Sequence, residues 1–133
     1  MMRLSRICLG LGVFFLLASC SGSAPAPADV ATKAPDEQAA LAALKEINRA
    51  QADFIRRTRR YAQFTSELVA DRLLTAEPAA EGYRITLLPS PDAGSYTLQA
   101  TPADAAARHF FTDQSGVVRV ETGKPATAES PEL

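Results

Sequence analysis

The stretch YRITLLPSPDAGSYTLQAT, residues 83–101, decides the fold. Apolar and polar side chains alternate on both sides of the segment 89–94, which contains prolines, a serine, an aspartate and a glycine. Alternation with a period of two is typical of a strand with one buried face, and such a segment between two strands is typical of a turn. The stretch therefore predicts an antiparallel hairpin.

A second hairpin follows directly. The strand segments HFFT, residues 109–112, and VVRV, residues 117–120, flank Asp113-Gln114-Ser115-Gly116. Aspartate in the first position and glycine in the last suit a type I turn. Together the two hairpins predict a four-stranded antiparallel sheet.

The segment before the hairpins has a helical period instead. Apolar residues recur every three or four positions between residues 36 and 60, and Asp36 and Glu37 supply the acidic start that a helix favours. A second, shorter helix is expected to begin with Thr65 or Ser66 as its cap and to carry Leu68, Val69, Leu73 and Leu74. The predicted fold class is α+β, with a long N-terminal amphipathic helix packed on the four-stranded antiparallel sheet.

The start of the chain has the layout of a secretory signal. Arg3 and Arg6 precede an apolar run at residues 7–17, and small residues follow before Cys20. At about 1.5 Å per residue in a helix, this run is roughly half as long as the ~30 Å hydrocarbon core that a spanning helix must cross. A cleaved signal is therefore favoured over a transmembrane anchor.

Leu17-Ala18-Ser19-Cys20 resembles the lipobox of bacterial lipoproteins. This resemblance implies diacylglyceryl transfer to the Cys20 thiol, cleavage before Cys20 and acylation of the new amino terminus. Ser21 follows the cysteine where an aspartate could stand, and in lipoproteins of two-membrane bacteria this implies sorting to the outer membrane, facing the periplasm. The implied partner is the membrane, reached through the acyl chains on Cys20.

These patterns divide the chain into four parts. Residues 1–19 are expected to be a lipoprotein signal peptide, and 20–35 the acylated cysteine with a flexible proline- and alanine-containing tether. Residues 36–121 are the expected α+β domain. The polar segment 122–133 is expected to be a disordered tail.

Four segments resemble the globular domain of type IV pilin-like proteins and secretion pseudopilins. They are ALKEINRAQ at 43–51, GYRITL at 82–87, YTLQATP at 96–102 and FFTDQSGVVR at 110–119. The resemblance covers residues 38–121 and implies a pilin-like helix-on-sheet domain. The polymerising helix of pilins is replaced here by a lipid and a tether, so the resemblance implies the fold and not assembly into a fibre.

The inventory of reactive residues predicts no catalytic site, no metal site and no cofactor. His109 is the only histidine, Cys8 lies in the signal, and Cys20 is the residue expected to be acylated. Ser95, Ser115 and Asp113 could approach His109, but no nucleophile motif surrounds them, and a half-exposed strand position for His109 is favoured. With 14 basic and 15 acidic residues, the chain also gives no electrostatic case for nucleic acid.

Two groups of charged residues could still bind something. Glu67 and Asp71, four residues apart, could hold a cation or act as acid and base, although a solvated helix face is the favoured interpretation. The cluster Arg56, Arg57, Arg59 and Arg60 could bind anionic head groups, a polyanion or an acidic partner protein. The alternative is that these cations merely favour a helix C-terminus, with Asp53 one turn before them.

Phe110 and Phe111 are adjacent on a predicted strand and so point to opposite faces of the sheet. One of them is expected in the core, and the other either forms an exposed interaction patch or lies under a helix or loop.

The function expected from the sequence is a lipid-anchored, non-enzymatic binding or scaffold module of the bacterial envelope, with an envelope protein as partner. An accessory component of a type IV pilus or type II secretion-like machine is an alternative. An enzyme that acts on envelope material is disfavoured, because the inventory of acid and base residues is thin.

Overall fold

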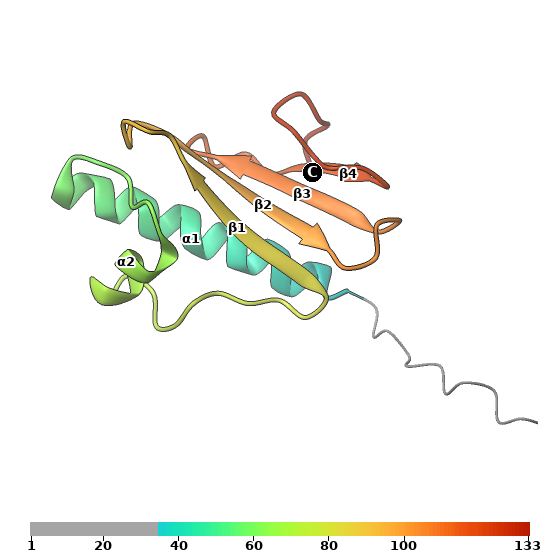
Figure 1. Cartoon of the computed structure of the whole chain (residues 1–133), viewed down its shortest axis with the longest axis horizontal. Helices are drawn as coiled ribbons and strands as arrows, with labels where there is room; N and C mark the ends of the chain where they lie inside the picture. The colour runs from blue at the N-terminus through green and yellow to red at the C-terminus, as the bar shows by residue number, and fades with distance from the viewer. Residues whose placement is uncertain (1–34) are drawn as a thin grey trace, which may run out of the picture. The chain divides into compact units, whose positions relative to one another are not determined.

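The computed structural model describes residues 35–133. The expected signal peptide, Cys20 and nearly all of the expected tether lie outside the described residues. Within them, α1 (Glu37–Thr58) and α2 (Thr65–Ala70) precede four strands, β1 (Tyr83–Pro89), β2 (Tyr96–Pro102), β3 (Arg108–Asp113) and β4 (Arg119–Thr122). Figure 1 shows α1 lying along one face of the sheet formed by these strands.

The first helix begins where its acidic start is expected. The Asp36 carboxylate accepts a hydrogen bond from the Ala39 N–H (2.9 Å), which satisfies one of the free donors of the first turn. The helix ends because Arg59 adopts a left-handed conformation, with φ of 66°. The helix begins at residue 37 and not at the start of the chain, so its description as N-terminal is wrong, while a helix packed on an antiparallel sheet is confirmed.

The buried stripe of α1 combines small and large side chains. Its alanines let the backbone approach the sheet, and its larger residues interdigitate with side chains from the strands. The buried residues are Ala40, Ala43, Leu44, Ile47, Ala50, Gln51 and Phe54.

The second helix differs from its expected form. Its N-cap is Phe64, which has no side-chain cap, so the prediction of Thr65 or Ser66 as the cap is wrong. The helix is short because Arg72 has a φ of 59°, and the N–H groups of Leu73 and Leu74 turn back to the Leu68 carbonyl. Leu74 is nevertheless buried in the core.

The sheet is an antiparallel meander with strand order β1-β2-β3-β4. The first hairpin turns between Pro89 and Tyr96, and the second turns at Asp113, whose carbonyl accepts from the Gly116 N–H (2.9 Å). Both turns lie where the sequence predicts them. Side chains of β1, β2 and β3 alternate between the face that packs on α1 and the opposite face, which we call the outer face.

The final segment is ordered, in contrast to the expected disordered tail. Gly123, with a φ of 74°, reverses the chain, and residues 124–133 return along β4. The Val120 N–H donates to the Pro131 carbonyl (2.9 Å), and the Leu133 N–H donates to the Val118 carbonyl (2.9 Å). This C-terminal segment therefore closes the free edge of β4.

Candidate functional site

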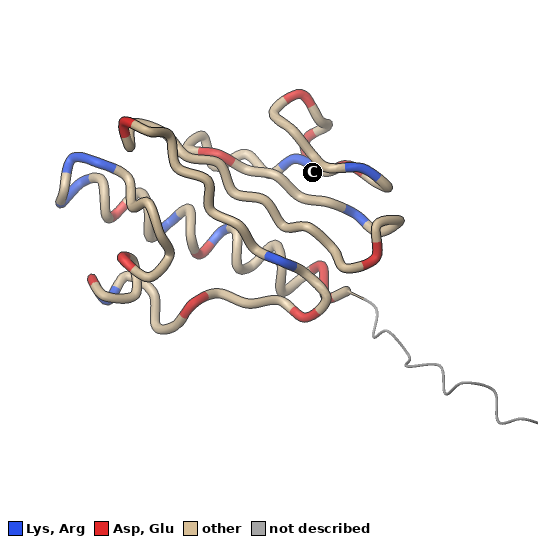
Figure 2. The backbone as a smooth tube through the Cα atoms, viewed as in Figure 1, with Lys and Arg blue, Asp and Glu red and all other residues tan. Residues whose placement is uncertain are grey.

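The arginine cluster at the end of α1 is largely neutralised by residues of the same domain. Figure 2 shows these basic residues together at the end of the helix, on the left of the view. Arg59 caps the helix through its backbone. The other three each have an acidic neighbour: Arg56 with Asp53 (3.3 Å), Arg57 with Asp71 (3.8 Å), and Arg60 with Glu67 (2.6 Å). The structure thus supports the interpretation as helix-end cations better than a free anion site.

Glu67 and Asp71, which the sequence suggests as an acid and base, each pair with a different arginine of this cluster. Glu67 bonds Arg60, and Asp71 lies beside Arg57. The hydrogen bond from the Arg60 guanidinium lowers the pKa of the Glu67 carboxyl below its usual value. A lowered carboxyl pKa keeps Glu67 ionised and makes it a structural ion-pair partner.

Phe110 and Phe111 point to opposite faces, as the strand geometry predicts, but neither forms an exposed patch. Phe110 is 1 % exposed and lies in the core beneath α1, whereas Phe111 is 6 % exposed on the outer face. The expected alternative of an exposed phenylalanine is therefore wrong. The C-terminal segment lies over part of the outer face: Pro125 and Ala126 lie beside His109, and the Arg119 guanidinium donates to the Ser130 carbonyl (2.8 Å).

His109 lies on this covered part of the outer face and is buried, so its expected half-exposed position is wrong. Its Nε2 atom is 3.4 Å from the Ala105 carbonyl oxygen. The Asp113 carboxylate instead accepts from the Ser115 N–H (2.8 Å) within the turn. In the part of the chain that the structure describes, no group of three or more histidine, cysteine or acidic side chains could hold a metal ion.

The outer face of β1 and β2 differs from the covered half, and we call it the open face. It carries alternate side chains of the two strands, three from each, all exposed or half-buried. A depression of about 640 Å³ lies at the end of this face where β1 begins and β2 ends. The residues of the open face are Arg84, Thr86, Leu88, Thr97, Gln99 and Thr101. The depression is lined by three of them, Arg84, Thr86 and Thr101, together with Gly82, Tyr83, Pro102 and Ala103.

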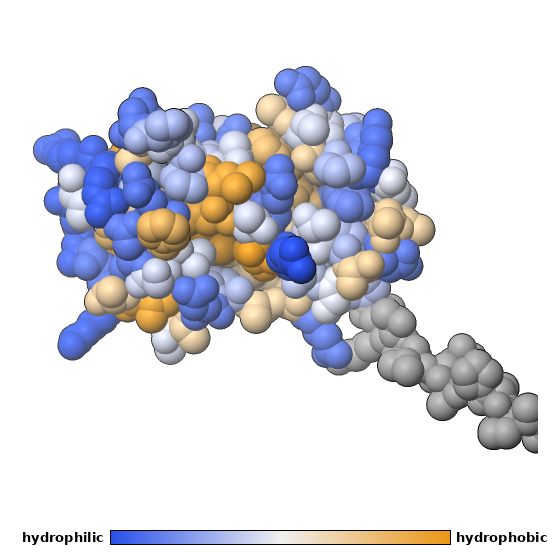
Figure 3. All heavy atoms as spheres, in the orientation of Figure 1, coloured by the Kyte–Doolittle hydropathy of each residue, from blue (hydrophilic) through white to orange (hydrophobic). Residues whose placement is uncertain are grey.

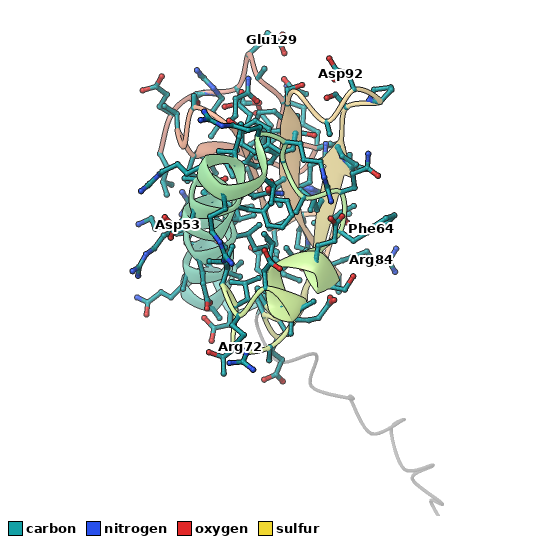
Figure 4. The ribbon with its side chains drawn as sticks, turned by 90° about the vertical axis from the view of Figure 1, so that its left-hand side faces the viewer. Asp53, Phe64, Arg72, Arg84, Asp92 and Glu129 are labelled. Carbon is teal, nitrogen blue, oxygen red and sulfur yellow. The ribbon has the colours of Figure 1, made fainter. Side chains whose placement is uncertain are left out.

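Large apolar side chains are exposed next to the open face. Phe64 is 65 % exposed and Leu88 is 47 % exposed. Figure 3 shows hydrophobic surface where β1 runs in Figure 1, with hydrophilic residues around it. In Figure 4, Phe64 and Arg84 project to the same side of the ribbon, away from α1. Exposed apolar surface with a polar surround is typical of a surface that binds a partner.

Arg84 is the charged group of the open face. Its side chain is exposed, and no residue in the described range 35–133 forms an ion pair with it. The arginines at the end of α1 are mostly paired, so Arg84 is better placed than they are to receive a carboxylate from another molecule.

Sequence reasoning missed the open face, although part of its signal was visible. The alternation of Arg84 and Thr86 with apolar residues marks a second, solvent-facing side of the strand. The alternation does not predict which part of the outer face the C-terminal segment covers.

Comparison with known proteins gives no relative: no protein-family model, no curated protein and no solved structure matches this chain. Among the helices of residues 35–133, none has the length and apolar character needed to cross a membrane.

Proposed function

We propose that this chain is a lipid-anchored protein of the bacterial envelope whose domain is a non-enzymatic binding or scaffold module. The anchor rests on the lipobox resemblance of Leu17–Cys20, and the observation that carries the binding role is the unequal covering of the outer face. The C-terminal segment lies against His109 and Phe111 is buried, whereas the outer-face side chains of β1 and β2 are exposed or half-buried. We propose this open face as the partner-binding surface.

The chemistry of the open face suggests what it binds. Leu88 and Phe64 offer apolar area, and Arg84 offers a guanidinium that pairs with no residue in the described part of the chain. A partner that presents apolar side chains next to a carboxylate would satisfy both groups. We therefore propose an envelope protein with such a surface as the partner.

The position of the first described residues supports a link between anchor and binding surface. The Asp36 N–H donates to the Glu81 carbonyl (2.9 Å), and a Cβ atom on Gly82 would lie 2.9 Å from the Pro35 Cα. The chain from Cys20 therefore joins the domain beside the depression of the open face. A lipid at Cys20 would hold this surface near the membrane and raise its effective concentration for a membrane-bound partner.

The pilin-like character of the domain belongs to the same proposal. A helix packed on an antiparallel meander is compatible with it. If the partner is a pseudopilin or another component of such a machine, the chain is an accessory of a pilus or secretion system.

Replacing Cys20 by alanine tests the anchor. We expect the Cys20→Ala protein to lose incorporation of labelled palmitate and to leave the membrane fraction or remain unprocessed, because no other thiol stands at the lipobox position. Ser21→Ala is the matched control and should keep the label. Palmitate labelling that persists in Cys20→Ala would contradict the anchor.

Site-specific crosslinking tests the binding surface. A photo-reactive residue at Thr101, which is exposed on the open face, should capture a defined envelope protein in cells. The same residue at Lys45, exposed on α1 across the domain, should capture much less of it. Adding Arg84→Glu to the Thr101 variant should reduce the capture. Equal capture from both positions would show that the open face is not the binding surface.

A further inference from the structure

The outer edge of β1 has hydrogen-bonding groups without partners, and the pairing with β2 identifies them. The Ser90 N–H donates to the Ser95 carbonyl (2.9 Å), and the Ala103 N–H donates to the Gly82 carbonyl (2.8 Å). Backbone groups of successive residues in an antiparallel strand point alternately toward and away from the neighbour. Those of residues 84, 86 and 88 therefore face β2, and those of Ile85 and Leu87 face outward.

The two ends of this edge are closed. The Tyr83 N–H is taken by the Ala80 carbonyl (3.1 Å), and Pro89 has no N–H. No described residue bonds the outward N–H and C=O groups of Ile85 or Leu87. The open stretch of the edge is therefore Arg84–Leu88, with Thr86 at its centre.

The opposite edge of the sheet, at β4, is already hydrogen-bonded to the C-terminal segment. The Pro131 carbonyl accepts from Val120 of β4, the Leu133 N–H donates to Val118 just before β4, and Arg119 pairs with Glu132. Since an unpaired edge is a template for another strand, the β1 edge is the one that, among residues 35–133, offers a run of free backbone groups to another strand.

We propose that two copies of this chain pair through their β1 edges, antiparallel, about a two-fold axis at Thr86. The Ile85 N–H then donates to the Leu87 carbonyl of the second copy, and the Leu87 N–H donates to the Ile85 carbonyl of the second copy. The two-fold axis repeats both bonds, so all outward donors of the open stretch are satisfied. Two four-stranded sheets become one continuous sheet.

The edge is self-complementary in hydrogen bonding, and its charges do not oppose the pairing. In this register Arg84 lies opposite Leu88 of the second copy, and Thr86 lies opposite Thr86, so no like charges face each other directly. A second copy is favoured as the occupant because the same surface serves both sides, and the closed β4 edge stops growth at two copies.

Beside the open stretch lies a groove of about 350 Å³ between the β1 edge and the start of α2. A strand added to the edge would enter this groove. Phe64 lines the groove and is 65 % exposed. The lining residues are Gln63, Phe64, Thr65, Ser66, Glu77, Ile85, Thr86 and Leu87. Pairing would give the exposed apolar side chains of this rim a partner.

A cysteine at the proposed axis tests the pairing and its register. Cα atoms of directly opposed residues in a non-hydrogen-bonded antiparallel pair are about 4.5 Å apart, within the range that a disulfide spans. The full-length Thr86→Cys protein, treated in cells with copper phenanthroline, should give a covalent dimer that dithiothreitol reverses. The wild-type chain controls for Cys8 and Cys20, and Thr101→Cys controls for an exposed cysteine on β2. No dimer above these controls would overturn the proposal.

A charge swap tests the same contact without relying on a covalent bond. Thr86→Lys places like charges opposite each other and should abolish co-purification of two differently tagged full-length copies. Thr86→Glu should do the same, whereas co-expression of the lysine and glutamate variants should restore it. Gln114→Lys, at an exposed turn position away from the open face, should leave the co-purification unchanged. Co-purification that ignores all Thr86 changes would overturn the proposal, and restoration by the mixed pair shows that both variants fold.

Discussion

Phe110→Ala is expected to lower the free energy of unfolding by about 3–5 kcal/mol, the usual cost of truncating a buried phenylalanine. Phe110 is 1 % exposed, and its ring lies 5.7 Å from that of Tyr83 and 5.4 Å from the Arg108 guanidinium carbon. Its loss would leave a cavity between α1 and the sheet. For a small domain this is a large share of total stability.

Urea unfolding followed by far-UV circular dichroism measures this effect. Phe64→Ala is the matched control, since Phe64 is the same residue type on the surface and should cost less than about 1 kcal/mol. Equal losses for the two variants would contradict the place of Phe110 in the core.

Gln51→Leu is expected to destabilise the domain by about 2–4 kcal/mol, although leucine has nearly the same size. The buried Gln51 amide donates to the Ala62 carbonyl (2.9 Å) and accepts from the Ala62 N–H (2.8 Å). Leucine would leave two buried backbone groups without partners, and each costs about 1–3 kcal/mol. The segment after α1 would lose the bonds that hold it against the helix.

The same unfolding measurement applies, with Gln114→Leu as the control at an exposed turn position. Gln114→Leu should change stability by less than about 0.5 kcal/mol. If Gln51→Leu is as stable as the wild type, the Ala62 backbone groups must find other partners and the proposed role of Gln51 is wrong.

A second polar network, partly buried, joins the helix to the sheet. The Tyr96 hydroxyl donates to the Asn48 side-chain carbonyl (2.8 Å), and the Asn48 amide donates to the Thr112 hydroxyl (2.9 Å). Burial raises the pKa of the Tyr96 hydroxyl, so it stays a hydrogen-bond donor. These bonds tie α1 to β2 and β3.

Local sequence patterns predicted the main elements because those patterns are properties of neighbouring residues. The alternation around residues 83–101 placed the first hairpin, and the spacing from Leu44 to Phe54 placed the long helix. Gln51 stood in the apolar stripe of that helix, but only the structure shows that Ala62 satisfies it.

Patterns at the element ends were less informative. The short helix was expected to reach Leu73 and Leu74, but the left-handed Arg72 ends it earlier. Apolar spacing alone does not report such a backbone conformation, because Leu74 is buried whether or not it is helical.

The sequence by itself determined that a helix packs on two hairpins and that Phe110 and Phe111 face opposite sides. Only the tertiary structure decided that the C-terminal segment, held by Arg119, returns along β4 and closes its edge, while the β1 edge and the open face keep exposed or half-buried residues. The physical reason is that periodicity assigns a side chain to a face through local backbone geometry. Covering that face depends on burial and hydrogen bonds made by segments that only the folded chain brings together.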